Sequence, residues 1–313
     1  MKDQRLAGID IGTLTCRLLI ADVPANGSLK ELHSERRILR LGEGVDQSKR
    51  LKAEAIDRVI RCVNDWRKIV EDYAVQRCSA VATSAVRDAA NRQEFLDKVK
   101  SHTGLDVEIL TGEEEARRTM LGIRSGLPQG ITDVLALDIG GGSTEFIAAQ
   151  QGQLPVVRSI DLGVVRLSER LLRHDPPTVG EIDQAREWIR RETRTASAGL
   201  PPSGGFTFVG TAGTITSLAA MAQQLPAYEP ARIHNYRLAL STIARLEQHL
   251  LSRSKAALVG MPGLEKNRED VIAAGTIILR TVMETLGQPE CLVSDLGLRE
   301  GVLIELAGRL SQR

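Results

Sequence analysis

The chain has 313 residues, of which 42% are apolar and 26% charged, which is enough for a substantial hydrophobic core and two domains of ordinary size. Its 41 basic and 40 acidic residues leave a formal charge of +1. This balance excludes a global positive field that would hold nucleic acid or an anionic membrane, so any affinity for polyanions must be local.

The sequence carries no signal for a membrane or a secretory pathway. No stretch approaches the roughly 18 uninterrupted apolar residues of a membrane span, and the N-terminal MKDQRLAGID has no apolar run typical of a signal peptide. Cys16, Cys62, Cys78 and Cys291 stand far apart without a Cys-x-x-Cys pair, which indicates neither a zinc site nor a disulfide framework. We expect a cytoplasmic protein.

The first half of the chain predicts three strands followed by alternating helices and strands. After a first apolar run that ends at Asp10, residues 16–23 predict a strand, Asn26-Gly27 a turn, and residues 28–41 a returning extended segment. Helical spacing of apolar residues predicts an amphipathic helix over 52–72. Further along, the patterns predict strands over 79–83 and 107–110 and helices over 91–102 and 112–123.

The second half repeats this order. It predicts strands near 133–139, 144–149, 154–161 and 206–210, with helices near 163–173, 178–197 and after Gly213. Helices over 239–251 and 268–286, a strand over 291–294 and a helix over 298–310 complete the chain. The turn-rich segment GLPQGIT at 126–132 predicts a boundary between domains 1–126 and 127–313, and we expect the helix at about 298–313 to pack back on the first domain.

Two Asp-Ile-Gly turns, Asp10–Thr15 and Asp138–Thr144, each lead from one apolar run into another. Aligned at an offset of 128 residues, the difference between Asp10 and Asp138, the segments Ala7–Leu19 and Leu135–Ile147 share Asp, Ile, Gly, a hydroxyl residue and flanking apolar alternation. One such match would be weak evidence. Two in register indicate a duplicated core.

Each turn has the chemistry of a phosphate-binding loop. Glycine permits a tight turn with exposed backbone N–H groups, which form a concave nest for anionic oxygens. Asp10 and Asp138 would repel a phosphate unless a divalent cation lay between them, which suggests a Mg²⁺-dependent site. The alternative is a pair of ordinary glycine hairpins with solvated Asp residues, but a hairpin needs no repeated Asp and hydroxyl. Hydroxyl donors for phosphate are supplied by Thr13, Thr15, Ser143 and Thr144.

The acidic run Glu113-Glu114-Glu115 suggests hydrolysis, because removal of a terminal phosphoryl group requires a water to be placed and deprotonated in line with the leaving oxygen. A structural alternative applies to Glu114. With Thr111 as N-cap, Glu114 occupies the third helical position and completes a capping box. We therefore predict that Glu114 caps the helix rather than acting as the base.

The chain resembles the exopolyphosphatase and guanosine pentaphosphate phosphohydrolase family of the actin, Hsp70 and sugar-kinase superfamily. The resemblance rests on the two Asp-Ile-Gly loops and on five further segments: ATSAVRDAAN at 82–91, TGEEEARR at 111–118, GTAGT at 210–214, MPGL at 261–264 and SDLGLREG at 294–301. It implies an α/β fold of two duplicated ribonuclease H-like (actin-like) domains with a central cleft, in the short two-domain form. It also implies a hinge near 126–132 and a homodimer.

The resemblance also assigns roles to residues. The family's catalytic Glu corresponds to Glu115, and Glu145 corresponds to a second carboxylate or metal ligand near the scissile phosphate. Arg87 occupies the position of an arginine that contacts phosphate. Gly210, Thr211 and Gly213 stand where relatives hold a purine nucleoside, although a strand-to-helix turn also needs glycine there. The expected Mg²⁺ ligands are Asp10, Asp138 and Glu145, and the expected phosphate-binding residues are Gly12, Thr13, Thr15, Arg87, Gly140, Gly141, Gly142, Ser143 and Thr144.

One departure from the family concerns the first loop, where the usual serine-asparagine-serine is replaced by Thr13-Leu14-Thr15. Backbone donors survive this change, so it affects the tightness and length preference for a phosphate chain rather than the existence of a loop.

Three functions fit these observations. The first is a metal-dependent phosphohydrolase that releases the terminal phosphate of inorganic polyphosphate or guanosine pentaphosphate, with Glu115 as the base. The second is a small-molecule kinase with the same fold, which would consume ATP only with an acceptor. The third is a catalytically weak sensor of polyphosphate or an alarmone, which would bind without releasing phosphate. The sequence leaves the choice between polyphosphate and guanosine pentaphosphate open.

Overall fold

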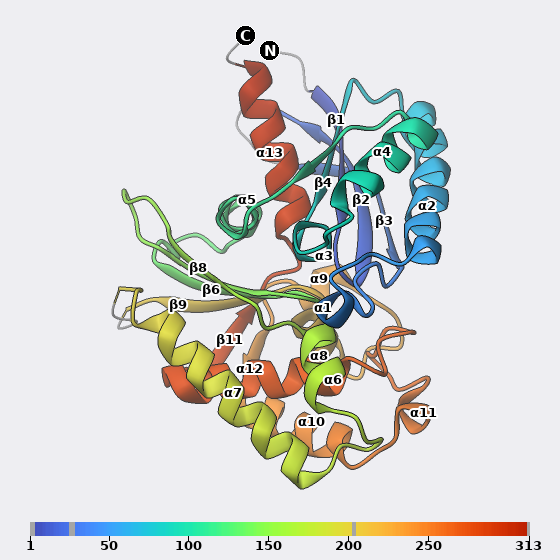
Figure 1. Ribbon diagram of the computed structural model, residues 1–313. Helices are drawn as coiled ribbons and strands as arrows, with labels where there is room; N and C mark the ends of the chain where they lie inside the picture. The colour runs from blue at the N-terminus through green and yellow to red at the C-terminus, as the bar shows by residue number, and fades with distance from the viewer. Residues whose placement is uncertain (1–3, 25–28, 202–204, 312–313) are drawn as a thin grey trace. The chain divides into compact units, whose positions relative to one another are not determined.

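The computed structural model of the protein describes residues 4–24, 29–201 and 205–311, so the turn predicted at Asn26-Gly27 lies outside the described residues. The chain divides into two compact units, one formed by Met1–Gly126 with Leu296–Arg313 and the other by Leu127–Asp295. Each unit is built around one β-sheet (Figure 1).

The sheet of the first unit has the strand order β3-β2-β1-β4-β5. Its first three strands form an antiparallel meander, and β4 and β5 are parallel to β1. The strands are β1 (Gln4–Ile11), β2 (Thr15–Val23), β3 (Lys30–Ile38), β4 (Arg77–Ala82) and β5 (Val107–Ile109). The helices are α1 (Val45–Ser48), α2 (Ala53–Asp72), α3 (Ser84–Arg87), α4 (Arg92–Thr103), α5 (Gly112–Ser125) and α13 (Leu298–Ser311).

Alternation along β1 assigns its side chains to two faces of this sheet. Ala7, Ile9 and Ile11 join the core under α2 and α4, whereas Leu6 packs with Leu303 of α13. Figure 1 shows α2 and α4 on one side of the sheet and α5 and α13 on the other. Because side chains alternate along a strand, Asp10 lies on the α13 face with Leu6.

The second sheet repeats the first. Its order is β10-β11-β9-β6-β7-β8, and its five strands β8-β7-β6-β9-β11 match β3-β2-β1-β4-β5 in order and in direction. The added edge strand β10 pairs antiparallel with β11. The strands are β6 (Val134–Ile139), β7 (Thr144–Ala149), β8 (Val156–Ile160), β9 (Thr207–Thr211), β10 (Arg237–Ala239) and β11 (Glu290–Val293). The duplicated α/β fold expected from the sequence is confirmed.

The helices of the second unit are α6 (Val164–Leu171), α7 (Val179–Ser197), α8 (Gly213–Ala222), α9 (Pro230–Ile233), α10 (Leu240–Leu251), α11 (Lys255–Leu258) and α12 (Ile272–Leu286). In the part of the chain that the structure describes, no helix has both the length and the apolarity needed to cross a membrane.

Helix α13 follows the last strand of the second unit but packs on the first, against α5 and β1. The second unit therefore ends at Asp295, whereas the boundary read from the sequence extends it to residue 313. Glycines bring the two helices into close contact: a Cβ on Gly301 would lie 1.7 Å from the carbonyl oxygen of Arg118. The buried Arg118 guanidinium also pairs with Glu108 at 2.7 Å and Glu305 at 2.7 Å.

Helix α5 begins with the capping box predicted from the sequence. The Thr111 hydroxyl accepts a hydrogen bond from the Glu114 N–H at 3.2 Å, and the Glu114 carboxylate accepts from the Thr111 N–H at 2.8 Å. These bonds satisfy backbone donors that the helix leaves unpaired. The structural role predicted for Glu114 is thus confirmed.

The packing of α13 on α5 makes Gly301→Ala destabilising. The new methyl group would overlap a backbone carbonyl that cannot move independently of α5, so we expect a loss of about 1–3 kcal/mol in the free energy of unfolding, measured in urea. The control is Gly308→Ala on the same helix, where a Cβ meets nothing within 4 Å and alanine favours the helix by about 1 kcal/mol. Equal stability of the two variants would contradict this account of the interface.

The capping box makes the stability contributed by Glu114 depend on pH. The Thr111 backbone N–H, followed by the Thr111 hydroxyl, lowers the pKa of Glu114 below its ordinary 4.5. A carboxyl whose pKa is depressed in the folded state contributes stability above its unfolded pKa and loses it as the pH falls. We expect Glu114→Gln to be less stable than the wild type at pH 7, with the difference shrinking below pH 4.5. A difference that grows in acid would refute this role.

Candidate functional site

The second Asp-Ile-Gly loop is a tight turn between β6 and β7 that presents backbone donors. The Gly140 N–H donates to the Ser143 carbonyl at 3.0 Å and closes the turn. Within the described residues, the N–H groups of Gly141, Gly142 and Ser143 have no hydrogen-bond partner. The Thr144 hydroxyl differs, because it is fully buried and donates to the Leu162 carbonyl at 2.5 Å. The loop therefore offers three consecutive amides to an anion.

The first loop has the same closure between β1 and β2, where the Gly12 N–H donates to the Thr15 carbonyl at 3.1 Å. The Thr13 hydroxyl shares a 2.8 Å hydrogen bond with the hydroxyl of Ser84, the first residue of α3. Leu14 is only 5% exposed, so its side chain packs inside the unit. The leucine at this position therefore leaves the closed turn intact, with the Thr13 hydroxyl bound to Ser84.

Arg87 and Glu115, predicted as a phosphate contact and the catalytic base, lie together in the first unit. Glu115 is in the first turn of α5 and is 8% exposed. Arg87 ends α3, and its Nη1 donates to Glu115 Oε2 at 3.1 Å and to the Leu110 carbonyl at 2.8 Å. These bonds hold the guanidinium in place, and the guanidinium in turn orients the Glu115 carboxylate.

A row of polar residues crosses four strands of the second sheet beside the loop. Asp138 pairs with Thr211 on one side and Glu145 on the other, and Glu145 pairs with Ser159. The Ser159 hydroxyl donates to Glu145 Oε1 at 2.8 Å, and Glu145 is 1% exposed. Like charges directly opposite on neighbouring strands destabilise a sheet. The Asp138–Glu145 pair therefore suits a bound cation.

The corresponding row of the first sheet has a different charge. Asp10 pairs with Val81 and with Arg17, which pairs in turn with Arg36. Arg17 thus occupies the position that Glu145 has in the second unit, and its Nη1 lies 4.0 Å from Asp10 Oδ2. The sequence analysis missed Arg17, although the alignment of the two repeats places it opposite Glu145. The first unit neutralises its aspartate with a side chain, and the second pairs two acids.

The carboxylates of this site suit Mg²⁺ better than a metal ion whose ligands all come from the protein. No group of three or more His, Cys, Asp or Glu side chains with metal-ligand geometry occurs among the described residues. Mg²⁺ usually keeps several waters and is bound through one or two carboxylates together with substrate phosphates. Asp138 and Glu145 satisfy this requirement in the second unit, whereas in the first unit Asp10 lies opposite Arg17.

The glycines predicted to face a purine are needed for packing inside the second unit. A Cβ on Gly210 would lie 2.6 Å from Cys291 Sγ, and one on Gly213 would lie 2.3 Å from the Arg268 guanidinium. Thr211, beside Asp138, ends β9. The structural alternative accounts for both glycines, and a nucleoside contact at this turn stays a prediction.

The cysteines offer no nucleophile. All four are free thiols, and Cys16, Cys62 and Cys291 are buried. Burial raises the pKa of Cys62 to about 12 and that of Cys78 to about 11, so the reactive thiolate is rare at neutral pH.

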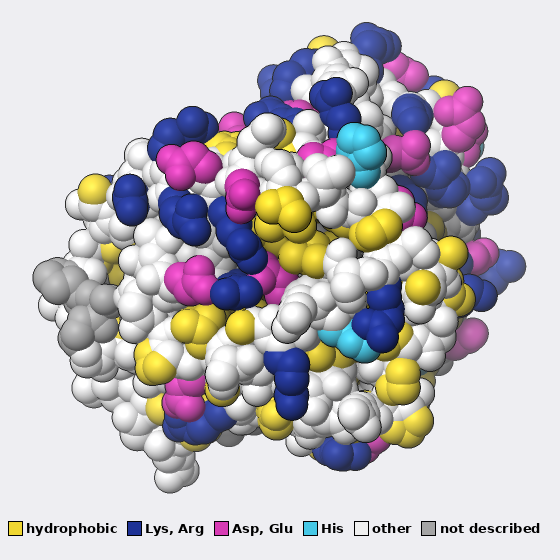
Figure 2. All heavy atoms as spheres, turned by 90° about the horizontal axis from the view of Figure 1, so that it is seen from below, with side chains coloured by type: hydrophobic (Ala, Val, Ile, Leu, Met, Phe, Trp, Pro, Cys, Tyr) yellow, Lys and Arg dark blue, Asp and Glu magenta, His cyan; other side chains and the backbone are white. Residues whose placement is uncertain are grey.

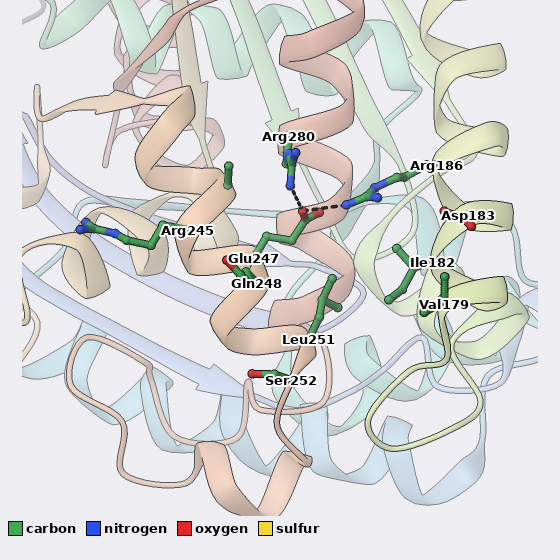
Figure 3. Close-up of a pocket in the computed structure, with 11 residues that line it drawn as sticks. Val179, Ile182, Asp183, Arg186, Arg245, Glu247, Gln248, Leu251, Ser252 and Arg280 are labelled. Carbon is green, nitrogen blue, oxygen red and sulfur yellow. Dashed lines mark hydrogen bonds and ion pairs between the residues drawn. The ribbon is translucent and has the colours of Figure 1, made fainter.

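A pocket of about 670 Å³ lies among α7, α10 and α12, and none of the predicted site residues lines it (Figure 3). At its centre the Glu247 carboxylate, 1% exposed, accepts hydrogen bonds from Arg186 at 2.9 Å and from Arg280. Each of the three charged residues comes from a different helix. The cluster therefore cross-links three helices of the second unit.

Figure 2 shows one face of the molecule, on which basic and acidic side chains are interspersed. No single sign of charge dominates the face shown, in keeping with the formal charge of +1. Attraction of an anionic substrate thus depends on local donors such as the loop amides.

Comparison with known proteins places this geometry in a family. The model of the Ppx/GppA phosphatase family matches residues 19–310. Exopolyphosphatase 2 of Mycobacterium tuberculosis is 35% identical over 316 residues, covering 97% of this chain and 99% of the relative. The crystal structure of the Aquifex aeolicus member of the Ppx/GppA family has a TM-score of 0.83 and 33% identity, covering 98% of both chains. An exopolyphosphatase from Cytophaga hutchinsonii has a TM-score of 0.88 and 28% identity, again covering 98% of both.

The match to the family model extends over most of the chain, and the curated relative and the solved structures cover nearly all of it. The protein therefore belongs to the Ppx/GppA phosphatase family.

Proposed function

We propose that the protein is a metal-dependent phosphohydrolase that releases the terminal phosphate of inorganic polyphosphate. The observation that carries this proposal is the position of the Glu115 carboxylate. Arg87, the last residue of α3, holds this carboxylate, and Ser84, the first residue of α3, shares a hydrogen bond with Thr13 of the first Asp-Ile-Gly loop. The relatives named exopolyphosphatase support polyphosphate as the substrate. Guanosine pentaphosphate carries a similar terminal phosphoanhydride and is the second candidate substrate.

The chain's own groups provide the elements of such a reaction. Glu115 accepts a proton from the attacking water, and the water oxygen forms a bond to the terminal phosphorus as the bridging P–O bond breaks. Loop amides such as those of Gly141 and Gly142 donate to phosphate oxygens and stabilise charge that develops there. Arg87, whose side chain is 22% exposed, offers further donors to phosphate while keeping Glu115 oriented.

A bound Mg²⁺ would neutralise charge on the phosphate oxygens. Asp138 and Glu145 would hold it in the second unit, since they lie opposite one another on neighbouring strands. The Ser159 hydroxyl fixes one oxygen of Glu145 and so limits the directions in which this carboxylate can bind. Asp10, in the first unit, stays a predicted Mg²⁺ ligand.

Replacement of the base tests the reaction. We expect Glu115→Gln to lower phosphate release by about 10²–10⁴-fold, because the amide cannot accept the proton of the attacking water, while substrate binding is retained. Release of inorganic phosphate is measured with Mg²⁺ on short and long polyphosphate, guanosine pentaphosphate and ATP in parallel. The matched control is the adjacent Glu114→Gln, which alters only the helix cap.

Turnover by Glu115→Gln at the wild-type rate would refute Glu115 as the base. Tight binding without release by the wild-type protein would favour the sensor instead, and loss of ATP only with an added acceptor would favour the kinase.

The acidic pair predicts how activity depends on Mg²⁺. We expect a chelator to abolish phosphate release, and Asp138→Asn to raise the Mg²⁺ concentration for half-maximal activity by about tenfold or more, because one charged ligand is lost. The measurement is a Mg²⁺ titration of the initial rate, with Asp183→Asn, at an exposed position of α7, as control. Full activity of the wild type in excess chelator, or an unchanged titration for Asp138→Asn, would contradict a metal at this pair.

A further inference from the structure

Helix α6 holds the carbonyl groups of the second loop. The Val164 N–H donates to the Gly140 carbonyl at 3.0 Å, and the Val165 N–H donates to the Gly141 carbonyl at 2.8 Å. The next carbonyl, that of Gly142, accepts from a side chain, the Nε–H of Arg166, at 2.9 Å. Three consecutive loop carbonyls are thus turned toward the start of one helix.

This arrangement sets the direction of the loop amides. In a planar trans peptide, the carbonyl of one residue and the N–H of the next point in opposite directions. Asp175-Pro176 is the one cis peptide in the described part of the chain, so the loop peptides are trans. The N–H groups of Gly141, Gly142 and Ser143 consequently point away from α6, and these are the three donors without partners among the described residues.

The close approach of α6 to the loop requires glycine at the residue before the helix. A Cβ on Gly163, the residue before α6, would lie 2.4 Å from the carbonyl of Gly141. Arg166 is 6% exposed. Its contact with the Gly142 carbonyl, at 2.9 Å, is shorter than its ion pair with the exposed Asp161, at 3.8 Å.

Comparison with the first loop shows which of these hydrogen bonds is specific to the second loop. There, the Gly42 N–H donates to the Thr13 carbonyl at 2.8 Å, and the Leu39 and Arg40 N–H groups donate to the Leu14 carbonyl at 2.9 Å. Backbone amides are enough for this loop, whose residues have side chains. The second loop has three consecutive glycines, which resist reorientation least, and it is held by a side chain as well.

We propose that Arg166 is a positioning residue for phosphate binding: its Nε–H holds the Gly142 carbonyl so that the Ser143 amide faces the phosphate group. This proposal deepens the function proposed above and rests on it. Arg166 acts through the loop and is not assigned a contact with substrate. Loss of the Nε–H frees the Gly142–Ser143 peptide to rotate, so the loop must be ordered again each time an anion binds.

The test uses inorganic phosphate as the probe, because it is a product and no hydrolysis can complicate its binding. The full-length protein, with glycine and serine labelled with ¹⁵N, is titrated with phosphate, and the amide signals of Gly142 and Ser143 are followed. For the wild type we expect saturable downfield shifts of both signals. For Arg166→Met we expect the apparent Kd to rise about tenfold and the Ser143 shift to be reduced.

Arg170→Met is the matched control, because Arg170 lies on the same helix and its guanidinium instead stacks on Trp188 at 5.1 Å. We expect wild-type shifts and affinity for this variant. Thermal unfolding of each variant separates a loss of folding from a loss of loop order. If Arg166→Met does not fold, Arg166→Leu provides the same comparison, since its side chain carries no hydrogen-bond donor.

Wild-type phosphate affinity and an unchanged Ser143 shift in a folded Arg166 variant would overturn the proposal. Shifts confined to the first loop in the wild-type protein would also overturn it, while leaving phosphate binding by the first unit intact. Failure of the proposed hydrolysis appears separately, as the absence of phosphate release by the wild-type protein, and does not affect the amide readout.

Discussion

The planarity of the peptide bond is the constraint on which the candidate site depends. In each unit, the segment that follows the third strand donates hydrogen bonds to the carbonyls of the Asp-Ile-Gly loop, from Leu39 to Gly42 in one case and from Val164 to Arg166 in the other. With its carbonyls turned back, each loop presents N–H groups on the opposite side. The conformations of the two Asp-Ile-Gly loops therefore result from sheet topology as much as from glycine, because the same strand order brings the same kind of segment against each loop.

The duplication preserved this backbone arrangement but not the charges. Beside equivalent aspartates, the first unit has Arg17 and the second has Glu145. An arginine neutralises Asp10 from within the protein, whereas the acidic pair of the second unit is best stabilised by a cation from outside. The asymmetry divides the proposed work. Glu115 and Arg87 belong to the first unit, whereas the carboxylates suited to Mg²⁺ belong to the second, together with the loop whose three amides have no partner among the described residues.

The sequence predicted most of the fold because the principal elements are long and periodic. The helix expected over 52–72 is α2 at Ala53–Asp72, and the duplicated strand order is confirmed. The short elements α3 and β10 were missed, since four and three residues are too few to show a period. The helix expected from 268 begins at Ile272, because Arg268 lies in a turn and packs against Gly213. Ser84, Ser159 and Arg166 were also missed, because their contacts depend on distant segments that periodicity does not reveal.

The central claim, that loop amides bind the phosphates of the substrate, is tested most directly by a crystal structure of Glu115→Gln protein with inorganic triphosphate and Mg²⁺. The account predicts phosphate oxygens within hydrogen-bond distance of the N–H groups of Gly141, Gly142 and Ser143, with the loop carbonyls still turned toward the segment that holds them. Triphosphate bound instead in the pocket of α7, α10 and α12, with the loop amides facing only solvent, would contradict it.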